Sequence, residues 1–492
     1  VLASEANPPV LRDELQHHAS GCYSAHSGMK RANRRAENEL LSAEKYACLA
    51  AVETDAKYPS EALKGAWENV LFNQFHDILC GCSIPSVHED AEHFYGESRA
   101  TAQRETNRAV QTIAGEIDTL KGADPMNAPD ELGRPMVVFN PLSWPVRVPV
   151  RIRGLFSESR QPPSASRYAA WNDRGESTPV QRTRSAYRLW DVEDGVFLAD
   201  VPAFGYALYY VRPAQAEGVQ GGATVETTEP EVIRASCDTI YGAHVMENSR
   251  LRVEVDAVSG GLRALHHKAS DTDVLADVAA RGLVMDDWEN DTWAHGVTHL
   301  DDRIGRFEDA EVSIVERGPV RCVVRSKTSY GNSVIRQDFI LYAGAGDLVV
   351  DVKLDWREKH KILKLSFPVD VTDPKSFYEI PYGTIERPCN GEEEPGLNWF
   401  AVNGTGPEGG PAGLAVLNDG KYSFSVEGTE MRLTAARSAI YADHGGVRDL
   451  DADYEYLDWG PQDFTYSLKP LAEARPKAAV VQRAHELNTD YE

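Results

Sequence analysis

The feature that most constrains this chain is a change in the spacing of its apolar residues near residue 130. Between Met29 and Leu120, apolar residues recur every three or four positions, as on one face of a helix. After a stretch rich in Gly, Pro, Asp and Asn from Gly122 to Pro135, they recur every second position, as in a strand with one buried face. The chain should therefore fold as a helical part followed by a longer β-rich part.

The helical part contains three amphipathic segments. The first runs from Met29 to about Ala50, with Ala at most apolar positions, so that a partner helix can approach closely. The second follows Pro59, with Ser60 as the predicted N-cap, and the third begins at a predicted capping box, Ser86–Glu89. Short connections favour an antiparallel three-helix bundle over residues 29–123.

Two β-rich segments are expected after the bundle. Residues 136–213 form a small β-domain, because Val148, Val150 and Ile152 alternate with polar residues. The polar, Gly-rich stretch Gln215–Glu229 is a predicted linker. Residues 230–492 contain many short alternating runs with Gly turns and form a large antiparallel β-sandwich. The predicted fold class is α+β multidomain.

Composition narrows the range of partners and compartments. The 492 residues provide for about three domains of ~150 residues each. A net charge of -25 disfavours nucleic acid as a partner, since phosphates attract clustered Lys and Arg. No apolar run approaches the ~18 residues of a membrane span, so we expect no membrane association. Seven scattered cysteines give no disulfide framework and favour a reducing, cytoplasmic setting.

The stretch Asn73–Ala91 carries the strongest candidate for chemistry, the pair His76 and Asp77. A neutral imidazole is a good zinc ligand, and a neighbouring carboxylate can bind a substrate hydroxyl. One histidine does not make a zinc site, and the alternative is a helix-terminal histidine bonded to backbone. A second alternative is a metal site of Cys80 and Cys82 with His76 and His88, which the absence of another nearby cysteine pair in the sequence disfavours.

Two other candidate loops also have purely structural interpretations. The His-rich loop Glu14–Met29, which contains His17, matches no established metal spacing. The segment Asp286–His295 interleaves carboxylates with tryptophans, as sugar-binding surfaces do, but it also fits an anchored acidic loop. The chain contains no nucleophile elbow, phosphate loop or HExxH motif.

Several motifs together resemble glycoside hydrolase family 38, the retaining α-mannosidases, and particularly its bacterial branch, which includes mannosylglycerate hydrolases. They are spread over nearly the whole chain: Lys30–Asn38, Asn73–Leu79 followed by Gly81–Ile84, Val138–Pro141, Glu379–Pro388, Leu417–Tyr422, Arg437–Ser438 and Ala484–Asn488. The resemblance implies a galactose-mutarotase-like sandwich and a zinc enzyme that hydrolyses mannose-containing oligosaccharides or mannosides. Retention implies two catalytic carboxyl groups ~5 Å apart.

The resemblance also implies roles for individual residues. His76 corresponds to one of four zinc ligands, and Asp77 corresponds to a residue that contacts the sugar. Tyr23 and His18 of the loop before the bundle, Asp291 of the acidic loop and Arg437 complete the expected substrate-binding set. Because the other three ligands, the nucleophile and the acid belong to an N-terminal α/β domain in this family, no catalytic residue is expected in this chain.

We therefore expect residues 1–28 to be the end of a catalytic region, the sandwich to be cut short at its C-terminal end, and the chain alone to be inactive. The alternative from another class is a non-catalytic carbohydrate-binding or scaffold protein with the same architecture. A third alternative is a different glycosidase on a similar sandwich, which the motif around His76 disfavours. Homo-oligomer formation is left open by the sequence.

Overall fold

The computed structural model describes residues 10, 18–123, 132–156, 167–183, 192–214, 234–236, 242–445, 448–449, 451–476 and 478–492. The predicted linker Gln215–Glu229, most of the linker Gly122–Pro135, and most of residues 1–28, His17 included, lie outside this part of the chain.

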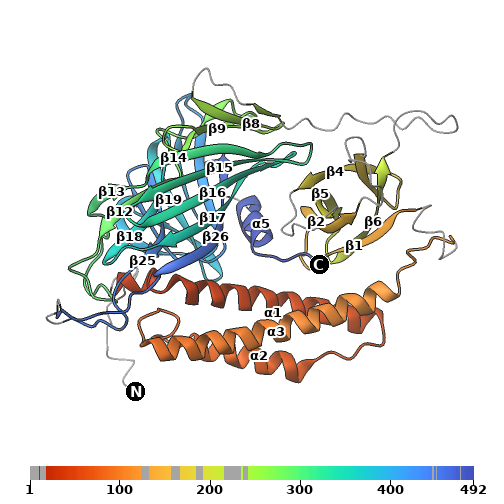
Figure 1. The fold of residues 1–492 in the computed structure, drawn as a ribbon, viewed down its shortest axis with the longest axis horizontal. Coiled ribbons are helices and arrows are strands. Elements are labelled where there is room, and N and C mark those ends of the chain that lie inside the picture. Colours follow the sequence, from red (N-terminus) through yellow and green to blue (C-terminus); the bar gives the residue numbers. More distant parts are fainter. Residues whose placement is uncertain are drawn as a thin grey trace.

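Three long helices lie side by side beneath the sheets (Figure 1). They are α1 (Ser27–Glu53), α2 (Ser60–Asn73) and α3 (Pro85–Gly115). Alanines such as Ala36, Ala43 and Ala102 are completely buried between them, which allows the helix backbones to approach closely. Two shorter helices in the described part of the chain are the 3-10 helix η2 (Ser20–Tyr23) and α5 (Ala478–Leu487).

The predicted starts of the second and third helices are wrong in detail. Ser60 is the first residue of α2, and neither Pro59 before it nor Ile84 before α3 caps its helix with a side chain. Pro85 opens α3 because its fixed φ suits the first helical position and its missing N–H leaves no donor unsatisfied. Ser86 thus lies inside the helix instead of capping it.

A six-stranded antiparallel sheet follows the helices in sequence, with the order β1-β6-β3-β4-β5-β2. Val148 and Ile152 are buried in it, so the predicted alternation is confirmed. The strands are β1 (Arg134–Asn140), β2 (Val146–Phe156), β3 (Arg167–Asn172), β4 (Ser177–Thr183), β5 (Val192–Val201) and β6 (Gly205–Ala214).

Three further sheets make up the rest of the β-rich part. A five-stranded sheet, in the order β11-β10-β9-β8-β7, contains β7 (Arg234–Ser236), β8 (Ala243–Glu247), β9 (Leu251–Asp256), β10 (Leu262–His267) and β11 (Thr272–Asp273). A six-stranded sheet, in the order β13-β12-β18-β25-β24-β21, contains β12 (Arg281–Asp286), β13 (Arg303–Arg306), β18 (Lys361–Pro368), β21 (Asn390–Pro395), β24 (Ser423–Glu427) and β25 (Glu430–Arg437).

The largest sheet has nine strands in the order β14-β15-β16-β17-β26-β23-β22-β19-β20. They are β14 (Glu308–Glu316), β15 (Arg321–Tyr330), β16 (Ser333–Tyr342), β17 (Leu348–Trp356), β19 (Thr372–Ile380), β20 (Gly383–Arg387), β22 (Trp399–Thr405), β23 (Pro411–Asn418) and β26 (Gly460–Leu471).

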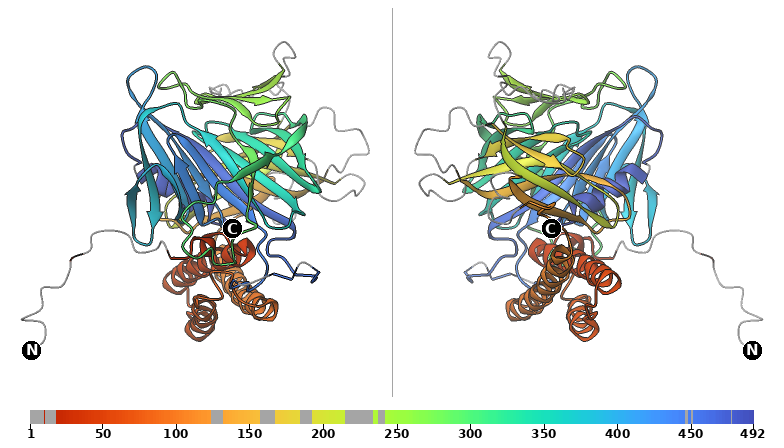
Figure 2. Two further views of the ribbon diagram at one scale, coloured as in Figure 1. Left: turned by 90° about the vertical axis from the view of Figure 1, so that its left-hand side faces the viewer. Right: turned by 90° about the vertical axis from the view of Figure 1, so that its right-hand side faces the viewer.

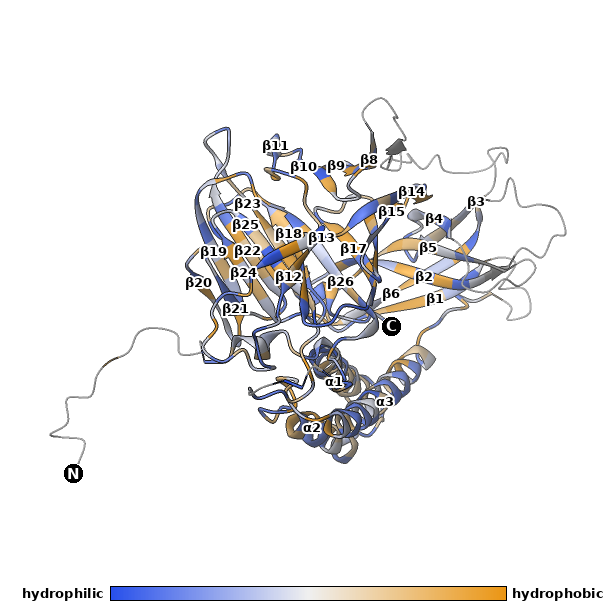
Figure 3. Ribbon diagram, turned by 60° about the vertical axis from the view of Figure 1, so that its left-hand side comes forward, coloured by the Kyte–Doolittle hydropathy of each residue, from blue (hydrophilic) through white to orange (hydrophobic). Residues whose placement is uncertain are grey.

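One large apolar core lies among these last three sheets, and Figure 3 shows orange, hydrophobic residues along their strands. Val350, Val352, Leu354 and Trp356 are all at most 2% exposed, as the alternation of β17 predicts. The chain is therefore α+β with a large β-rich part. Among the helices that are described, none has the length and apolar character needed to cross a membrane.

The two views in Figure 2 show the three helices packed beneath the large β structure. Side chains of α1 contact loops of that structure. Arg34 donates to Asn398 Oδ1 at 2.7 Å and to the Tyr422 hydroxyl at 3.1 Å, with its guanidinium 4.4 Å from the Tyr422 ring centroid. At the start of α1, the Ser27 hydroxyl donates to Asp458 at 2.9 Å. These contacts fix the first part of α1 against loops of the β-rich part.

Candidate functional site

The short helix η2 is held between the helices and a long loop that follows β12. The Gly21 amide donates to the Trp293 carbonyl at 2.9 Å, and the Ser20 hydroxyl donates to the Val297 carbonyl at 2.6 Å. A Cβ atom at Gly21 would overlap the Arg437 guanidinium and the backbone of Trp293, so only glycine fits there. The predicted N-terminal loop and the predicted acidic loop are thereby brought together.

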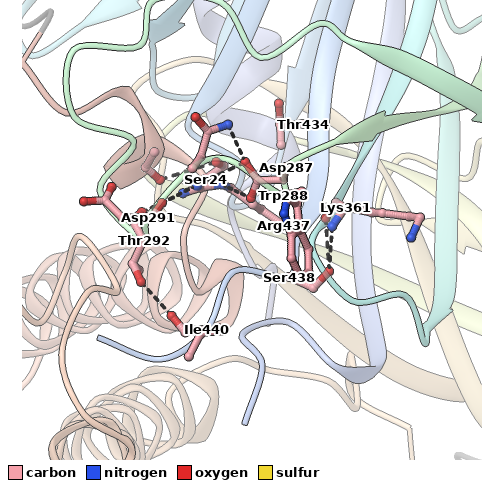
Figure 4. A network of polar contacts seen from close by, with 12 residues as sticks. Ser24, Asp287, Trp288, Asp291, Thr292, Lys361, Thr434, Arg437, Ser438 and Ile440 are labelled. Carbon is pink, nitrogen blue, oxygen red and sulfur yellow. Dashed lines mark hydrogen bonds and ion pairs between the residues drawn. The ribbon is translucent and has the colours of Figure 1, made fainter. Parts of the chain in front are cut away.

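Arg437, at the end of β25, is hydrogen-bonded to several residues of the acidic loop (Figure 4). Its guanidinium donates to the Asp287 carboxylate at 2.9 and 3.3 Å and to the carbonyl oxygens of Asp291 at 2.7 Å and Thr292 at 2.6 Å. The side chains of Arg437 and Asp287 are completely buried. In this structure Arg437 supports the loop, and its predicted direct contact with substrate stays a prediction.

Asp291 and a group of imidazole rings form the exposed side of this loop. The His295 Nδ1 lies 2.8 Å from Asp291 Oδ2, an arrangement in which the carboxylate orients the imidazole. The His18 ring packs edge-on against His295 at 5.4 Å between centroids, and His444 approaches the same ring at 5.0 Å. The predicted residues His18 and Asp291 therefore meet through His295.

A cleft of about 430 Å³ opens beside this cluster. Arg448 lines the cleft, with an ion pair to Asp443 at 2.9 Å and its guanidinium 5.6 Å from the Trp288 ring centroid. The Trp288 indole and the Glu289 carboxylate are exposed there, and such groups can bind the C–H faces and hydroxyls of a sugar. The cleft is lined by Trp288, Glu289, Asn290, Asp291, Ala294, His295, Val297, Asp443, Gly445 and Arg448.

His76 and Asp77 lie on the turn that follows α2. The His76 side chain is 79% exposed and that of Asp77 is 43% exposed, and His76 Nε2 lies 3.8 Å from Asp77 Oδ1. The Phe75 ring packs against His76 at 4.2 Å. Two adjacent donors at the surface can supply part of a metal site, but zinc requires three or four ligands.

Tyr23, the remaining residue of the predicted substrate-binding set, is half-buried in η2. The structure thus gathers the predicted residues into two groups, with His18, Asp291 and Arg437 around the acidic loop and His76 with Asp77 on the turn after α2. Their binding roles stay predictions.

A second cluster of imidazoles lies near η2. The rings of His26 and His88 are 4.5 Å apart, and Tyr441 lies 5.9 Å from each of them. Burial lowers the pKa of His26 and of His88 to about 4, with Lys30 adding to the effect at His26 and His26 adding to it at His88. Both imidazoles are therefore neutral at pH 7.

The sequence motifs did not single out Tyr441 and His444, because both stand in a loop that has no recognisable spacing. They reach the site only because the segment after β25 folds back over η2 and the acidic loop. His295 is the last residue of the segment Asp286–His295, which the sequence already marks as a candidate for sugar binding. Its place near the site could therefore be predicted.

Two family profiles and several known α-mannosidases are similar to this chain. Residues 17–113 match the family profile described as "Alpha mannosidase middle domain", and residues 246–445 match "Glycosyl hydrolases family 38 C-terminal domain". The chain is 26% identical over 489 residues to mouse "Alpha-mannosidase 2C1" and 25% identical over 490 residues to its human counterpart. Each alignment covers 95% of this chain and 39% of the relative, so the chain spans about two fifths of the relatives' length.

Two solved structures share the fold. An α-mannosidase from Enterococcus faecalis superposes with a TM-score of 0.73 at 15% identity, covering 97% of this chain and 58% of that one. A second Enterococcus faecalis protein, of glycosyl hydrolase family 38, superposes with a TM-score of 0.74 at 17% identity, covering 100% of this chain and 61% of that one.

Proposed function

We propose, from the premise that this chain belongs to glycosyl hydrolase family 38, that it is the middle and C-terminal part of a zinc-dependent retaining α-mannosidase. In this proposal the helices of residues 29–123 are the middle domain and residues 230–492 are the C-terminal sandwich. The substrates are mannose-containing oligosaccharides or mannosides, and the setting is cytoplasmic.

The observation that carries the proposal is the position of His76. Its imidazole is 79% exposed and lies beside Asp77, with Nε2 3.8 Å from the Asp77 Oδ1. Because its ring is not buried, the imidazole of His76 is accessible to a metal ion. His76 and Asp77 fit one corner of a zinc site, in which the metal would hold the sugar hydroxyls when bound.

The donors in the described residues do not complete that site. Only one group of three or more close metal-ligating side chains occurs in this part of the chain, and it does not include His76. In this proposal, as the family resemblance implies, the other zinc ligands and both catalytic carboxyls lie outside this chain, and the 492 residues alone should not hydrolyse mannosides. The proposal assigns no catalytic step to the residues of this chain.

Hydrolysis of an aryl α-mannoside tests the proposal. The full polypeptide encoded around this sequence should be active, His76→Ala should abolish the activity, and His93→Ala, at an exposed histidine of α3, should leave it intact. The 492-residue chain alone should be inactive. An inactive full polypeptide would contradict the proposed activity. An active 492-residue chain that loses its activity with His76→Ala would contradict the proposal that the other catalytic residues lie outside this chain.

A second function, sugar binding without catalysis, is favoured by the cleft at Trp288. The Trp288 indole is 43% exposed and lines the cleft, so that a sugar ring can contact it without any metal. Mannose binding to the 492-residue chain, measured by calorimetry, should weaken in Trp288→Ala and persist in Trp459→Ala, a similarly exposed indole outside the cleft. Equal mannose binding by both variants would show that the cleft is not the binding site.

A further inference from the structure

Three cysteine side chains from two separate segments meet between η2 and the turn after α2. The Sγ atoms of Cys22, Cys80 and Cys82 all lie within 4.8 Å of one another. Those of Cys22 and Cys82 are 3.6 Å apart. Cys82 is 1% exposed, and the other two side chains are half-buried. The three thiols therefore form one compact, largely enclosed group.

The separation of the sulfur atoms fits a shared metal ion better than a disulfide. An ion bound at the usual Zn–S distance of ~2.3 Å in tetrahedral geometry holds its sulfur ligands about 3.8 Å apart. A disulfide requires about 2.05 Å between sulfurs. The 3.6 Å between Cys22 and Cys82 lies close to the first value, and all three thiols are within the span that one ion can close.

The backbone at Gly81 brings Cys80 and Cys82 to the same place. Gly81 has a φ of +80°, which turns the chain between the two cysteines, and a Cβ there would lie 2.6 Å from the His26 Cβ. The Gly81 segment is thereby packed directly on residues 25 and 26, just beyond η2. The glycine thus allows two cysteines of one turn to face the third from another segment.

The surrounding charge suits a group of thiolates. The Lys30 ammonium is buried and donates to the carbonyl oxygens of Ala25 at 2.6 Å, Leu79 at 3.2 Å and Cys80 at 3.0 Å. All three of these acceptors are neutral backbone groups. A buried cation needs compensation, and a divalent ion with three thiolates has a net charge of −1, which Lys30 balances.

We propose that Cys22, Cys80 and Cys82 form a thiolate site for a thiophilic divalent cation, with Zn²⁺ as the resident ion. Binding displaces the thiol protons to solvent and ties η2 to the turn that carries His76. The fourth position is open to water. The site uses neither His76 nor Asp77 as a ligand.

Cobalt titration of the 492-residue chain tests this directly. The chain is purified under reducing conditions, stripped with a chelator and titrated with Co²⁺, which reports thiolate ligands by intense sulfur-to-metal charge-transfer absorption in the near ultraviolet. One equivalent of Co²⁺ should produce these bands, and Zn²⁺ should displace it. Oxygen and nitrogen ligands do not give such bands, so Co²⁺ at His76 cannot imitate the result.

Matched variants assign the ligands. Cys82→Ser should weaken Co²⁺ binding by more than ~100-fold, because even changes outside the ligand shell cost ~10–100-fold. Cys48→Ser, at an exposed cysteine of α1, and His76→Ala should leave the bands unchanged. Circular dichroism verifies that the Cys82 variant is folded.

Two results would overturn the proposal. One is wild-type protein, folded and reduced, that takes up Co²⁺ without charge-transfer bands. The other is bands of full intensity in Cys82→Ser. Either result can be obtained whether or not the chain takes part in mannoside hydrolysis, so failure here is separate from failure of the proposed function.

Discussion

The guanidinium of Arg437 donates to both carboxylate oxygens of Asp287, at 2.9 and 3.3 Å, and no part of either side chain reaches solvent. The pair joins the last residue of β25 to the first residues after β12, 150 positions apart. Because Arg437 also donates to the carbonyls of Asp291 and Thr292, it sets the course of the loop that carries the cleft.

Removing one partner of this pair should be severely destabilising. Asp287→Ala leaves the buried Arg437 charge without its carboxylate, and we expect a loss of about 3–5 kcal/mol in the free energy of unfolding. Asp355→Ala is the control, because it breaks a 2.7 Å pair with Arg357 that is roughly half exposed and should cost about 0–1 kcal/mol. Urea unfolding measures both, and similar losses would contradict the importance of the buried pair.

Two glycines with the same backbone angle separate strain from steric overlap. Gly81 and Gly409 both have a φ of +80°, but a Cβ at Gly409 meets nothing within 4 Å. Gly409→Ala should therefore cost only the left-handed strain of about 1–2 kcal/mol. Gly81→Ala adds overlap with Ala25 and His26 and should cost about 2–5 kcal/mol. Thermal unfolding compares them, and equal losses would mean that the packing around Gly81 relaxes.

The buried imidazoles His26 and His88 should make the protein less stable in acid. Each pKa is about 4 in the folded chain against 6.5 when unconstrained, so the unfolded state binds more protons between these values. The free energy of unfolding should rise with pH through this window by up to about 1.4 kcal/mol per pH unit for each imidazole. Above pH 6.5 the contribution of the two imidazoles should be constant.

The variant His88→Leu isolates one imidazole. It removes a titrating ring whose nitrogens have no hydrogen-bond partner within the described structure, so the slope of unfolding free energy between pH 4 and 6.5 should decrease. His93→Leu, at an exposed position, should retain the original slope. Identical slopes in the two variants would show that His88 does not contribute.

A second buried ion pair should tolerate joint replacement better than single replacement. Lys364 and Glu393 contact each other with no exposure, and Glu393 also accepts from Ser423 and, at 2.8 Å, from Thr434. Lys364→Met alone should cost about 3–5 kcal/mol, since Glu393 loses its counter-charge. Adding Glu393→Leu should recover part of that loss in urea unfolding. A further loss would show that the hydroxyls, and not the ammonium, hold Glu393.

The local elements were largely predictable. The buried alternation in β2, β9 and β17 follows from side chains pointing to opposite faces of a strand, which sequence alone displays. The exact helix starts were not. Pro59, and not Ser60, takes the N-cap position of α2, and the fixed φ of Pro85 suits the first position of α3, so that the predicted cap Ser86 lies inside the helix.

The sequence by itself determined the α+β class, the three helices and the family motif at His76, because these depend on residues close together in the chain. Only the tertiary structure decided that His18 meets Asp291 through His295, and that Cys22 joins Cys80 and Cys82. Such contacts link segments 60 to nearly 280 positions apart and depend on how α1 packs on the sheets. Periodicity carries no information on these pairings, since long-range packing and buried charge select them.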